Sequence, residues 1–232
     1  MGGGGFSTEP DNLALDVYTI EQARRANPSV CFVATASGDA ATYIVCFYAA
    51  FSQLSCQPCH LTLFDRTPDL RSLLLRQDII YVGGGNTKSM LGVWREWGLV
   101  EILREAWDAG VVLAGISAGA ICWFETGITD SWKGRLAPMA CLGLLSGACC
   151  PHYDSEPERR PALHDLVVTG AVSSALALED GAAAHFVGDK LFQVVTSRPN
   201  ANAYHVRLDG CKAVDDVLSS RRLEKAMLSS AT

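Results

Sequence analysis

A glycine-flanked serine in the motif GISAG, residues 115–119, is the feature of this sequence that best fits catalysis. It follows an apolar, β-branched run at 111–114 that predicts a buried strand, and helix-compatible residues resume after it. A strand that turns directly into a helix strains the backbone of the central residue, and the two glycines leave room for that bend. Such a turn would present the Ser117 hydroxyl at a helix N-terminus, where N–H groups can stabilise an oxyanion. The motif therefore predicts a nucleophilic serine; the alternative is an ordinary strand-to-helix turn that contains serine.

A serine hydroxyl is a weak nucleophile near neutral pH and needs a neutral imidazole as its general base. Of the five histidines, His152 follows the apolar segment 142–150, so it is predicted to lie at the rim of a sheet. His164 falls inside a predicted helix, and the other three begin or lie within strand-like segments. Position therefore favours His152 as the base.

The imidazole in turn needs a carboxylate that fixes its tautomer. The candidates are Asp130, Asp154, Glu179 and Asp180. Asp154 is too close in sequence to fold back easily onto the ring of His152, whereas Asp180 follows an apolar strand and should also lie at a rim. Each carboxylate, taken singly, fits a solvated surface position equally well, so these residues alone leave the acid open.

A second glycine-rich segment, GGGNT at residues 83–87, follows the apolar run DIIYV at 78–82. Glycines at the carboxyl end of a strand allow close backbone approach, so their N–H groups can point at an anion. The segment lacks the ending of a phosphate-binding P-loop and the spacing of a dinucleotide fingerprint. An oxyanion-binding loop beside the serine turn fits it better, because ligands gather at the carboxyl ends of parallel strands. A phosphate cradle and an ordinary loop are the alternatives.

The composition indicates one globular domain over residues 1–232, since 49% of the residues are hydrophobic and 19% are charged. The net charge of −6 carries no long runs and argues against a nucleic-acid or membrane surface. No apolar stretch is long enough to span a bilayer and no basic leader precedes an apolar run, so we expect a cytoplasmic protein. Nine cysteines, an odd number, do not suggest a disulfide framework.

Short apolar strands alternate with helices along the chain, which predicts an α/β fold with a mostly parallel, doubly wound sheet. The tail at 212–232 is expected to be helical, and the segment 1–28 precedes the first predicted strand. Strands are predicted at 29–35, 60–64, 78–82, 111–114, 142–150 and 175–178, helices at 40–54, 69–76, 101–109 and 158–169, and a loop at 125–130.

The run CQPCH at residues 56–60 matches the attachment pattern of c-type haem and resembles the C-x-P-C of thiol oxidoreductases. Haem attachment requires export, and no second axial ligand is indicated. We therefore interpret the run as the start of a core strand and expect neither a cofactor nor a metal.

Taken together, GGGGF at 2–6, VGGGNT at 82–87, GISAGA at 115–120, the TD pair at 129–130 and CPHYDSEPERRP at 150–161 resemble the aspartyl dipeptidase (peptidase E) and cyanophycinase family of serine peptidases. The resemblance extends from residue 2 to about residue 208. It implies an α/β/α sandwich similar to class I glutamine amidotransferase domains, with serine in place of their cysteine.

The resemblance also implies roles for individual residues. Ser117 becomes the nucleophile, His152 the base and Asp130 the third member of the triad. Asp180 is the rival acid, because a family segment appears here as LEDG at 178–181. The implied oxyanion hole consists of the N–H groups of Gly85 and Ala118, and the adjacent Gly84 and Asn86 are expected to bind substrate.

Two departures from the family pattern bear on fold and specificity. Members carry an apolar first strand before the glycine run, so segment 1–28 is expected to leave an edge gap or to lack the native start. Members that demand an N-terminal aspartate carry an arginine after the histidine motif, where this chain has Glu158 followed by Arg159 and Arg160. A guanidinium there would bind the aspartyl carboxylate, so both arginines are candidate substrate-binding residues and the side-chain specificity stays open.

The sequence thus predicts a serine dipeptidase that hydrolyses short peptides at the N-terminal residue, with Asp-X dipeptides among the candidate substrates. One alternative is a cyanophycinase-like hydrolase of β-aspartyl peptides. The other is a non-catalytic binding protein that uses the same pocket. We expect a small peptide as the partner, with no nucleic acid and no membrane, and an edge strand that would support a homodimer.

Overall fold

A four-stranded parallel sheet forms the centre of the computed structural model, which describes residues 1–224. Its strand order is β2-β1-β3-β4, and both inner strands are almost completely buried. Strands covered on both faces are expected to be apolar, as the buried residues VCFV of β1 and IIYV of β3 are. The strands are β1 (Ser29–Val33), β2 (Gln57–Leu61), β3 (Ile79–Val82) and β4 (Val112–Gly115).

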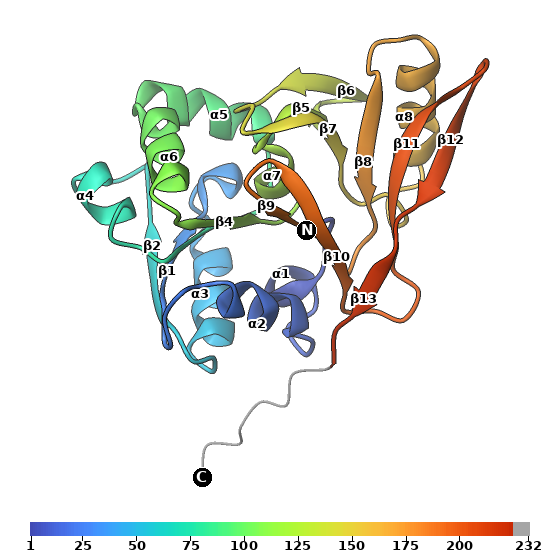
Figure 1. The fold of residues 1–232 in the computed structure, drawn as a ribbon. Helices are drawn as coiled ribbons and strands as arrows, with labels where there is room; N and C mark the ends of the chain where they lie inside the picture. The colour runs from blue at the N-terminus through green and yellow to red at the C-terminus, as the bar shows by residue number, and fades with distance from the viewer. Residues whose placement is uncertain (225–232) are drawn as a thin grey trace.

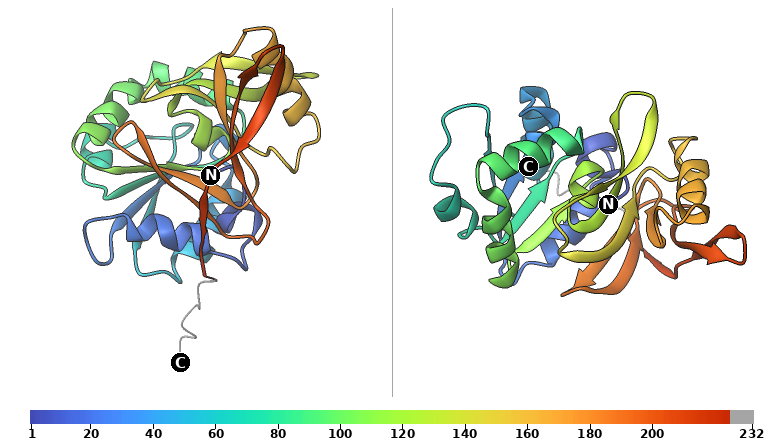
Figure 2. Two further views of the ribbon diagram at one scale, coloured as in Figure 1. Left: turned by 45° about the vertical axis from the view of Figure 1, so that its right-hand side comes forward. Right: turned by 90° about the horizontal axis from the view of Figure 1, so that it is seen from above.

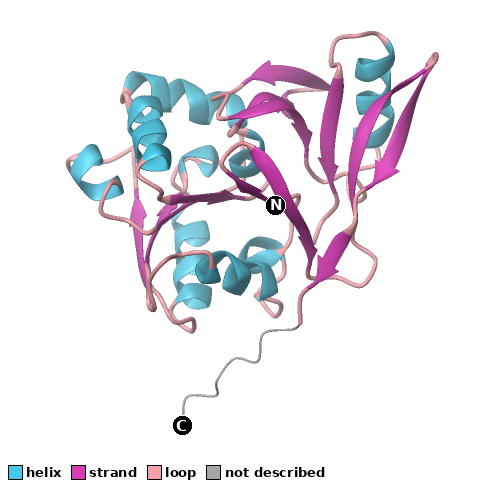
Figure 3. Ribbon diagram, viewed as in Figure 1, coloured by secondary structure: helices cyan, strands magenta, loops and turns pink. Residues whose placement is uncertain are grey.

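Helices cover both faces of this sheet (Figures 1 and 3). Side chains of β1 alternate between two cores: Phe32 packs in the aromatic cluster of Phe6 and Phe47, whereas Val33 packs in the cluster of Trp94 and Leu103. One face carries α1 (Gly5–Thr8), α2 (Ala14–Glu21) and α3 (Ala41–Phe51). The other face carries α4 (Leu70–Leu74), α5 (Thr87–Glu96), α6 (Leu99–Asp108) and α7 (Ala118–Ile121). A 3-10 turn spans Thr35–Ser37.

A six-stranded mixed sheet forms the other half of the molecule, with the order β12-β11-β8-β7-β5-β6. Helix α8 (Arg159–Val168) packs against β11 and β12 over a third apolar cluster that includes Ile128 and Leu163. The strands are β5 (Phe124–Trp132), β6 (Arg135–Ala140), β7 (Leu145–Cys150), β8 (Ser174–Leu178), β11 (Ala203–Asp209) and β12 (Lys212–Val217).

A third, three-stranded sheet has the order β13-β10-β9. It consists of β9 (Ala182–Val187), β10 (Lys190–Thr196) and β13 (Ser220–Arg222). The expected helical tail at 212–232 is therefore wrong over its described part, because β12 and β13 pair with β11 and β10 there. Residues 225–232 lie outside the described residues.

The predicted α/β class with a parallel sheet is confirmed, whereas several element boundaries differ. The predicted strand 60–64 occurs at Gln57–Leu61, and the helix 40–54 is shorter, at Ala41–Phe51. The predicted loop 125–130 is part of β5, because its residues pair with β6 on one side and β7 on the other. Two carboxylates at the exposed positions of a strand gave the segment the composition of a loop.

Helices of membrane-spanning length and apolarity do not occur among residues 1–224. Nor do those residues contain a group of three or more His, Cys, Asp or Glu side chains that could hold a metal ion.

The chain's first three residues lie between the sheets (Figure 2). The Met1 amino group donates to the carbonyl oxygen of Gly115, at the end of β4, over 2.9 Å. Gly3 forms a parallel bridge with Asp180, next to β9. This segment therefore connects the parallel sheet to the strands on the other side of the molecule.

Candidate active site

The turn at Ser117 has the strained geometry that the motif predicts. Ser117 adopts φ 56° and ψ −115° between β4 and α7, a left-handed backbone that is uncommon for a residue with a side chain. A Cβ atom on Gly115 would lie 2.1 Å from the carbonyl oxygen of Gly119, and one on Gly119 would lie 2.1 Å from that of Val82. Both glycines are therefore sterically required, and the packing of three backbones fixes the position of Ser117.

The glycine loop after β3 lies directly against the serine. A Cβ on Gly84 would be 3.2 Å from the Cβ and 3.7 Å from the Oγ of Ser117. The Gly84 N–H donates to the Tyr43 hydroxyl over 3.2 Å, and that hydroxyl also shares a 2.8 Å hydrogen bond with Ser7 Oγ. The sequence did not indicate Tyr43 or Ser7, which position the loop from α3 and α1.

The next two residues of the loop are fixed by neighbouring backbone. Gly85 has φ 137°, and a Cβ on it would lie 2.2 Å from the carbonyl oxygen of Ala36. Asn86 caps helix α5, because its Oδ1 accepts from the Ser89 N–H over 2.9 Å. The N–H groups of Gly85 and Ala118 donate to no other residue within 1–224. These two donors are therefore free to bind a ligand oxygen, whereas the Asn86 side chain already has a structural partner.

His152 and Asp180 form a hydrogen-bonded pair, with 2.7 Å between His152 Nδ1 and Asp180 Oδ1. His152 follows β7 and Asp180 follows β8, and these strands are adjacent and parallel, so their carboxyl ends meet at one edge. Both side chains are largely buried. Burial alone would raise the pKa of Asp180, but the hydrogen bond and charge of His152, together with Ser155 and the charge of Arg198, hold that pKa below its ordinary value.

The carboxylates near the His152–Asp180 pair have different structural roles. Asp154 accepts a hydrogen bond from the Asp180 N–H over 2.8 Å, and so it holds the backbone of the residue that bonds His152. Glu179 is buried, with Oε1 accepting from the Tyr204 hydroxyl over 2.8 Å and Oε2 accepting from a backbone N–H. Of the two acids in the LEDG segment, Glu179 therefore bonds Tyr204 and a backbone N–H, whereas Asp180 bonds the imidazole of His152.

The structure does not bring Asp130 to His152, contrary to the role that the family resemblance implied. Its side chain is 64% exposed on β5, and its Oδ1 lies 3.6 Å from Arg159 Nη2. Strand β7 has β5 on one side and β8 on the other, so acids from either neighbour were plausible partners for His152. The structure places the β8 acid, Asp180, at the imidazole.

The two candidate arginines have different surroundings. Arg159 is buried, donates to Glu156 over 2.7 Å and to the Ile128 carbonyl oxygen over 3.1 Å, and so has a structural role. Arg160 is 43% exposed, 3.8 Å from Glu179 and 3.4 Å from Asp215, and its guanidinium lies over two aromatic rings. It lines an open cavity of about 560 Å³, together with Tyr153, Asp154, Pro157, Pro161, His164 and Glu179.

Three other histidines have hydrogen-bond partners of their own. His60 shares a hydrogen bond with Tyr48, His164 with Asp215 and His185 with Tyr18. His60 belongs to the CQPCH run, whose cysteines are free and whose strand, β2, is the edge of the parallel sheet. The run therefore forms an edge strand rather than the core strand that we expected.

Residues 1–3 contact both halves of the site, a role that sequence reasoning missed. The Ser117 N–H donates to the Met1 carbonyl oxygen over 3.1 Å, and Gly2 donates to Ala182 over 3.0 Å. A Cβ on Gly3 would lie 2.1 Å from Asp180 Oδ1. The glycine run at the start of the chain was the available signal, because consecutive glycines indicate close approach by another part of the chain.

The chain is similar to known peptidases in sequence and in fold. The model of a family described as Peptidase family S51 matches residues 1–194. The chain is 56% identical to the uncharacterized peptidase YgaJ of Bacillus subtilis over 209 residues, 90% of each protein, and 29% identical to Peptidase E of Shewanella amazonensis over 53% of this chain and 56% of that protein. The fold is similar to the crystal structure of a peptidase from an acI-B1 Actinobacterium, with TM-score 0.73 and 18% identity over 97% of this chain and 95% of that one.

Proposed function

Because the chain belongs to peptidase family S51 and is a serine peptidase, we propose that it is a dipeptidase whose catalytic triad is Ser117, His152 and Asp180. The observation that carries this proposal is the 2.7 Å bond from His152 Nδ1 to Asp180. With Nδ1 donating to the carboxylate, Nε2 is the basic nitrogen that can take a proton from serine.

In the proposed mechanism, Ser117 Oγ attacks the carbonyl carbon of the scissile peptide bond as its proton moves to His152 Nε2. The Asp180 carboxylate stabilises the imidazolium that forms. The carbonyl oxygen becomes an oxyanion and accepts hydrogen bonds from the N–H groups of Gly85 and Ala118, which have no other partner within residues 1–224. The imidazolium then gives its proton to the leaving amine, and a water molecule activated by the same histidine hydrolyses the acyl-enzyme.

Arg160 is the proposed ligand for a substrate carboxylate. It lines a cavity with Tyr153 and Glu179, the neighbours in sequence of His152 and Asp180, and its guanidinium is partly exposed. Glu179 and Asp215 already balance the charge of Arg160. A short peptide would therefore bind there only if its carboxylate matches the N–H groups of the guanidinium in geometry. Arg159 is excluded from this role because its donors are occupied and buried.

The test is hydrolysis of a peptide panel, followed by chromatography of the released amino acids. The panel contains Asp-Leu, Ala-Leu, β-Asp-Arg, the tripeptide Asp-Leu-Ala and acetyl-Asp-Leu. We expect turnover of an α-linked dipeptide, much slower turnover of the acetylated one and none by Ser117→Ala. Turnover restricted to β-Asp-Arg would replace the proposal with a β-aspartyl hydrolase, and no turnover of any member would indicate the binding-protein alternative.

Arg160→Gln tests the carboxylate site, with Arg207→Gln, a partly exposed arginine on β11, as the matched control. Removing one charge-assisted contact should raise KM about tenfold with little change in kcat. The control should leave both constants unchanged, because the acids that Arg207 contacts within residues 1–224, Asp209 and Asp216, lie on its own hairpin. Equal effects of the two substitutions would contradict the assignment.

A further inference from the structure

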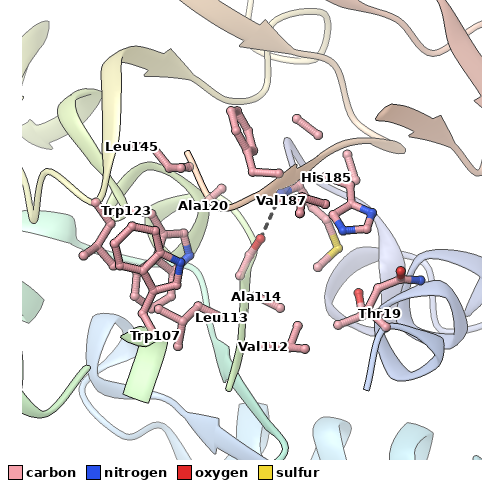
Figure 4. A pocket seen from close by; sticks show the side chains of 18 of the residues that line it. Thr19, Trp107, Val112, Leu113, Ala114, Ala120, Trp123, Leu145, His185 and Val187 are labelled. Atoms are coloured by element: carbon pink, nitrogen blue, oxygen red, sulfur yellow. Dashed lines mark hydrogen bonds between the residues drawn. The ribbon is translucent and has the colours of Figure 1, made fainter. Parts of the chain in front are cut away.

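The two edge strands of the parallel sheet have different surroundings. Strand β4 borders a cavity of about 690 Å³, whose lining includes Leu113, Trp107 and Trp123 and no cysteine of residues 1–224 (Figure 4). Strand β2 is the other edge, with β1 as its neighbour. The cysteines of this sheet lie here, Cys31 on β1 and Cys59 on β2. Thiol chemistry in the sheet is therefore confined to the β2 edge.

Cys31 and Cys59 lie side by side. They are partners in the register of the two parallel strands, and paired residues direct their side chains to the same face of a sheet. Both pack in the apolar cluster that contains Val33 and Leu61. Cys31 is completely buried, whereas Cys59 is partly exposed. The two thiols are therefore neighbours, and a dissolved reagent reaches the pair through Cys59.

The CQPCH run suggests a different pair, Cys56 with Cys59, but the fold separates these two thiols. They are three positions apart, so the alternation of an extended chain turns them to opposite faces of the sheet. Cys56 packs in the aromatic cluster on the other face, where its Sγ donates to the Phe51 carbonyl oxygen over 3.4 Å. The thiol partner of Cys59 is therefore its register partner, Cys31.

The spacing of adjacent strands suits a disulfide between register partners. Their Cα atoms lie about 4.8 Å apart, within the range of roughly 4.4–6.8 Å that a disulfide spans. The Cβ atoms of a disulfide lie closer together, at roughly 3.5–4.5 Å, so the bridge requires a small shift of one strand. Because β2 is an edge strand, it can make this shift without displacing a second neighbour. The resulting strain would make the bridge easy to reduce.

The two thiols differ in reactivity. A hydrogen bond from the Cys31 thiol lowers the pKa of Cys59 and raises that of Cys31. Cys59 in turn donates to Gln77 Oε1 over 3.6 Å. Elsewhere burial raises the pKa of Cys56 to about 11 and that of Cys149 to about 12. The thiolate is the attacking species, so Cys59 is the nucleophile of the pair.

We propose that Cys31 and Cys59 form a thiol–disulfide exchange site that accepts a small, uncharged disulfide as its oxidant. The Cys59 thiolate attacks one sulfur of that disulfide, which forms a mixed disulfide and releases one small thiolate. Cys31 then loses its proton and attacks the Cys59 sulfur, which closes the protein disulfide and releases the second small thiolate. The two protein thiols lose two electrons, the small disulfide gains them, and the two released thiolates take up the two protons.

The test uses the full chain and bis(2-hydroxyethyl) disulfide. Reduced, folded protein is incubated with an excess of this oxidant at about pH 8, near the ordinary pKa of a thiol. Acid then stops the exchange, because it removes the thiolate. Pepsin digests the protein in the same acid, and mass spectrometry identifies the peptides without reduction. We expect the peptides of Cys31 and Cys59 to be joined, with the mass of the two lowered by two hydrogen atoms.

Cys59→Ser and Cys56→Ser are matched variants, because each removes one thiol of the CQPCH run. Cys59→Ser should abolish the bridge and leave Cys31 unmodified, since Cys31 is buried. Cys56→Ser should leave the yield of the bridge unchanged. Cys31→Ala should stop the reaction at the mixed disulfide, so that Cys59 carries the added mass of half the oxidant.

Three outcomes would overturn the proposal. In the first, the wild type joins Cys56 to Cys59. In the second, Cys59 stays free or keeps the mixed disulfide while Cys31 stays a thiol. In the third, the bridge forms only in urea, which would show that the folded sheet does not hold the two thiols together. The wild-type digests decide all three, so a variant that fails to fold leaves the test intact. None of these measurements depends on peptidase activity.

Discussion

The two halves of the site are held in place by different physical means. Around Ser117, three backbones pack so closely that neither Gly115 nor Gly119 tolerates a Cβ atom. Around His152, polar contacts determine the arrangement: Asp180 holds the ring and Asp154 holds the Asp180 backbone. The first half is defined by local steric exclusion, and the second depends on residues 26 to 28 positions apart in the chain that meet at one sheet edge.

This difference implies different responses to substitution. A steric arrangement fails when an atom is added, whereas a hydrogen-bonded arrangement weakens by degrees when a partner is removed. Residues 1–3 connect the halves through Ser117 and Asp180, so a change in this segment should affect both.

The largest effect is expected from Gly119→Ala, which tests the steric half. The new Cβ would lie 2.1 Å from the Val82 carbonyl oxygen, so the turn must move and the Ser117 hydroxyl with it. We expect loss of measurable peptidase activity and a decrease of several kcal/mol in the free energy of unfolding, measured by urea titration.

Gly92→Ala is the matched control for that substitution. Gly92 lies inside helix α5 with open space where its Cβ would be. The change should keep full activity and stabilise the protein by about 0.5–1 kcal/mol. Retention of activity in Gly119→Ala would show that the turn is not sterically defined.

The same difference explains how far the sequence could be interpreted. The Ser117 turn was predictable because its cause, the two glycines, lies within five consecutive residues. The partner of His152 was not, because Asp130 lies on β5 and Asp180 follows β8, the two strands beside β7, and choosing between them requires the strand order. The α/β class followed from strand and helix periodicity, whereas the tail at 212–224 was misassigned because its strands depend on pairing with β10 and β11.

Asp16→Asn is expected to have an intermediate effect on stability. It tests how the N-terminal segment that connects the two halves of the site is held in place. Asp16 is buried and accepts the Phe6 N–H over 2.8 Å, which holds the end of the glycine run. Burial raises its pKa to about 7, against hydrogen bonds from Phe6 and Tyr81 that lower it. Between about pH 4 and pH 7 the unfolded chain has lost this proton and the folded chain keeps it, so the wild type loses stability as the pH rises.

The asparagine variant lacks this titration. Its free energy of unfolding relative to wild type should therefore increase between pH 4 and pH 7.5, by on the order of 4 kcal/mol. Urea titrations of both proteins at several pH values measure the difference. A difference that stays constant across this range would contradict a raised pKa for Asp16.

The smallest effect is expected from Tyr43→Phe, which removes one contact from the steric half. The Tyr43 hydroxyl connects Ser7 to the Gly84 N–H beside Ser117, so its loss leaves that N–H unpaired. We expect kcat to decrease about three- to tenfold, corresponding to about 1 kcal/mol. Tyr48→Phe is the control, because that hydroxyl bonds the exposed His60 instead. If both variants lower kcat equally, positioning of the glycine loop by Tyr43 is refuted.

The most direct test of the Ser117-His152-Asp180 assignment is the rate at which a fluorophosphonate modifies Ser117, followed by intact-protein mass spectrometry. Asp180→Asn should lower this rate by a factor of about 10²–10⁴, because the imidazole loses the carboxylate that sets its tautomer. Asp130→Asn should stay within about twofold of wild type, since Asp130 contacts Arg159. A large decrease with Asp130→Asn and none with Asp180→Asn would contradict the account.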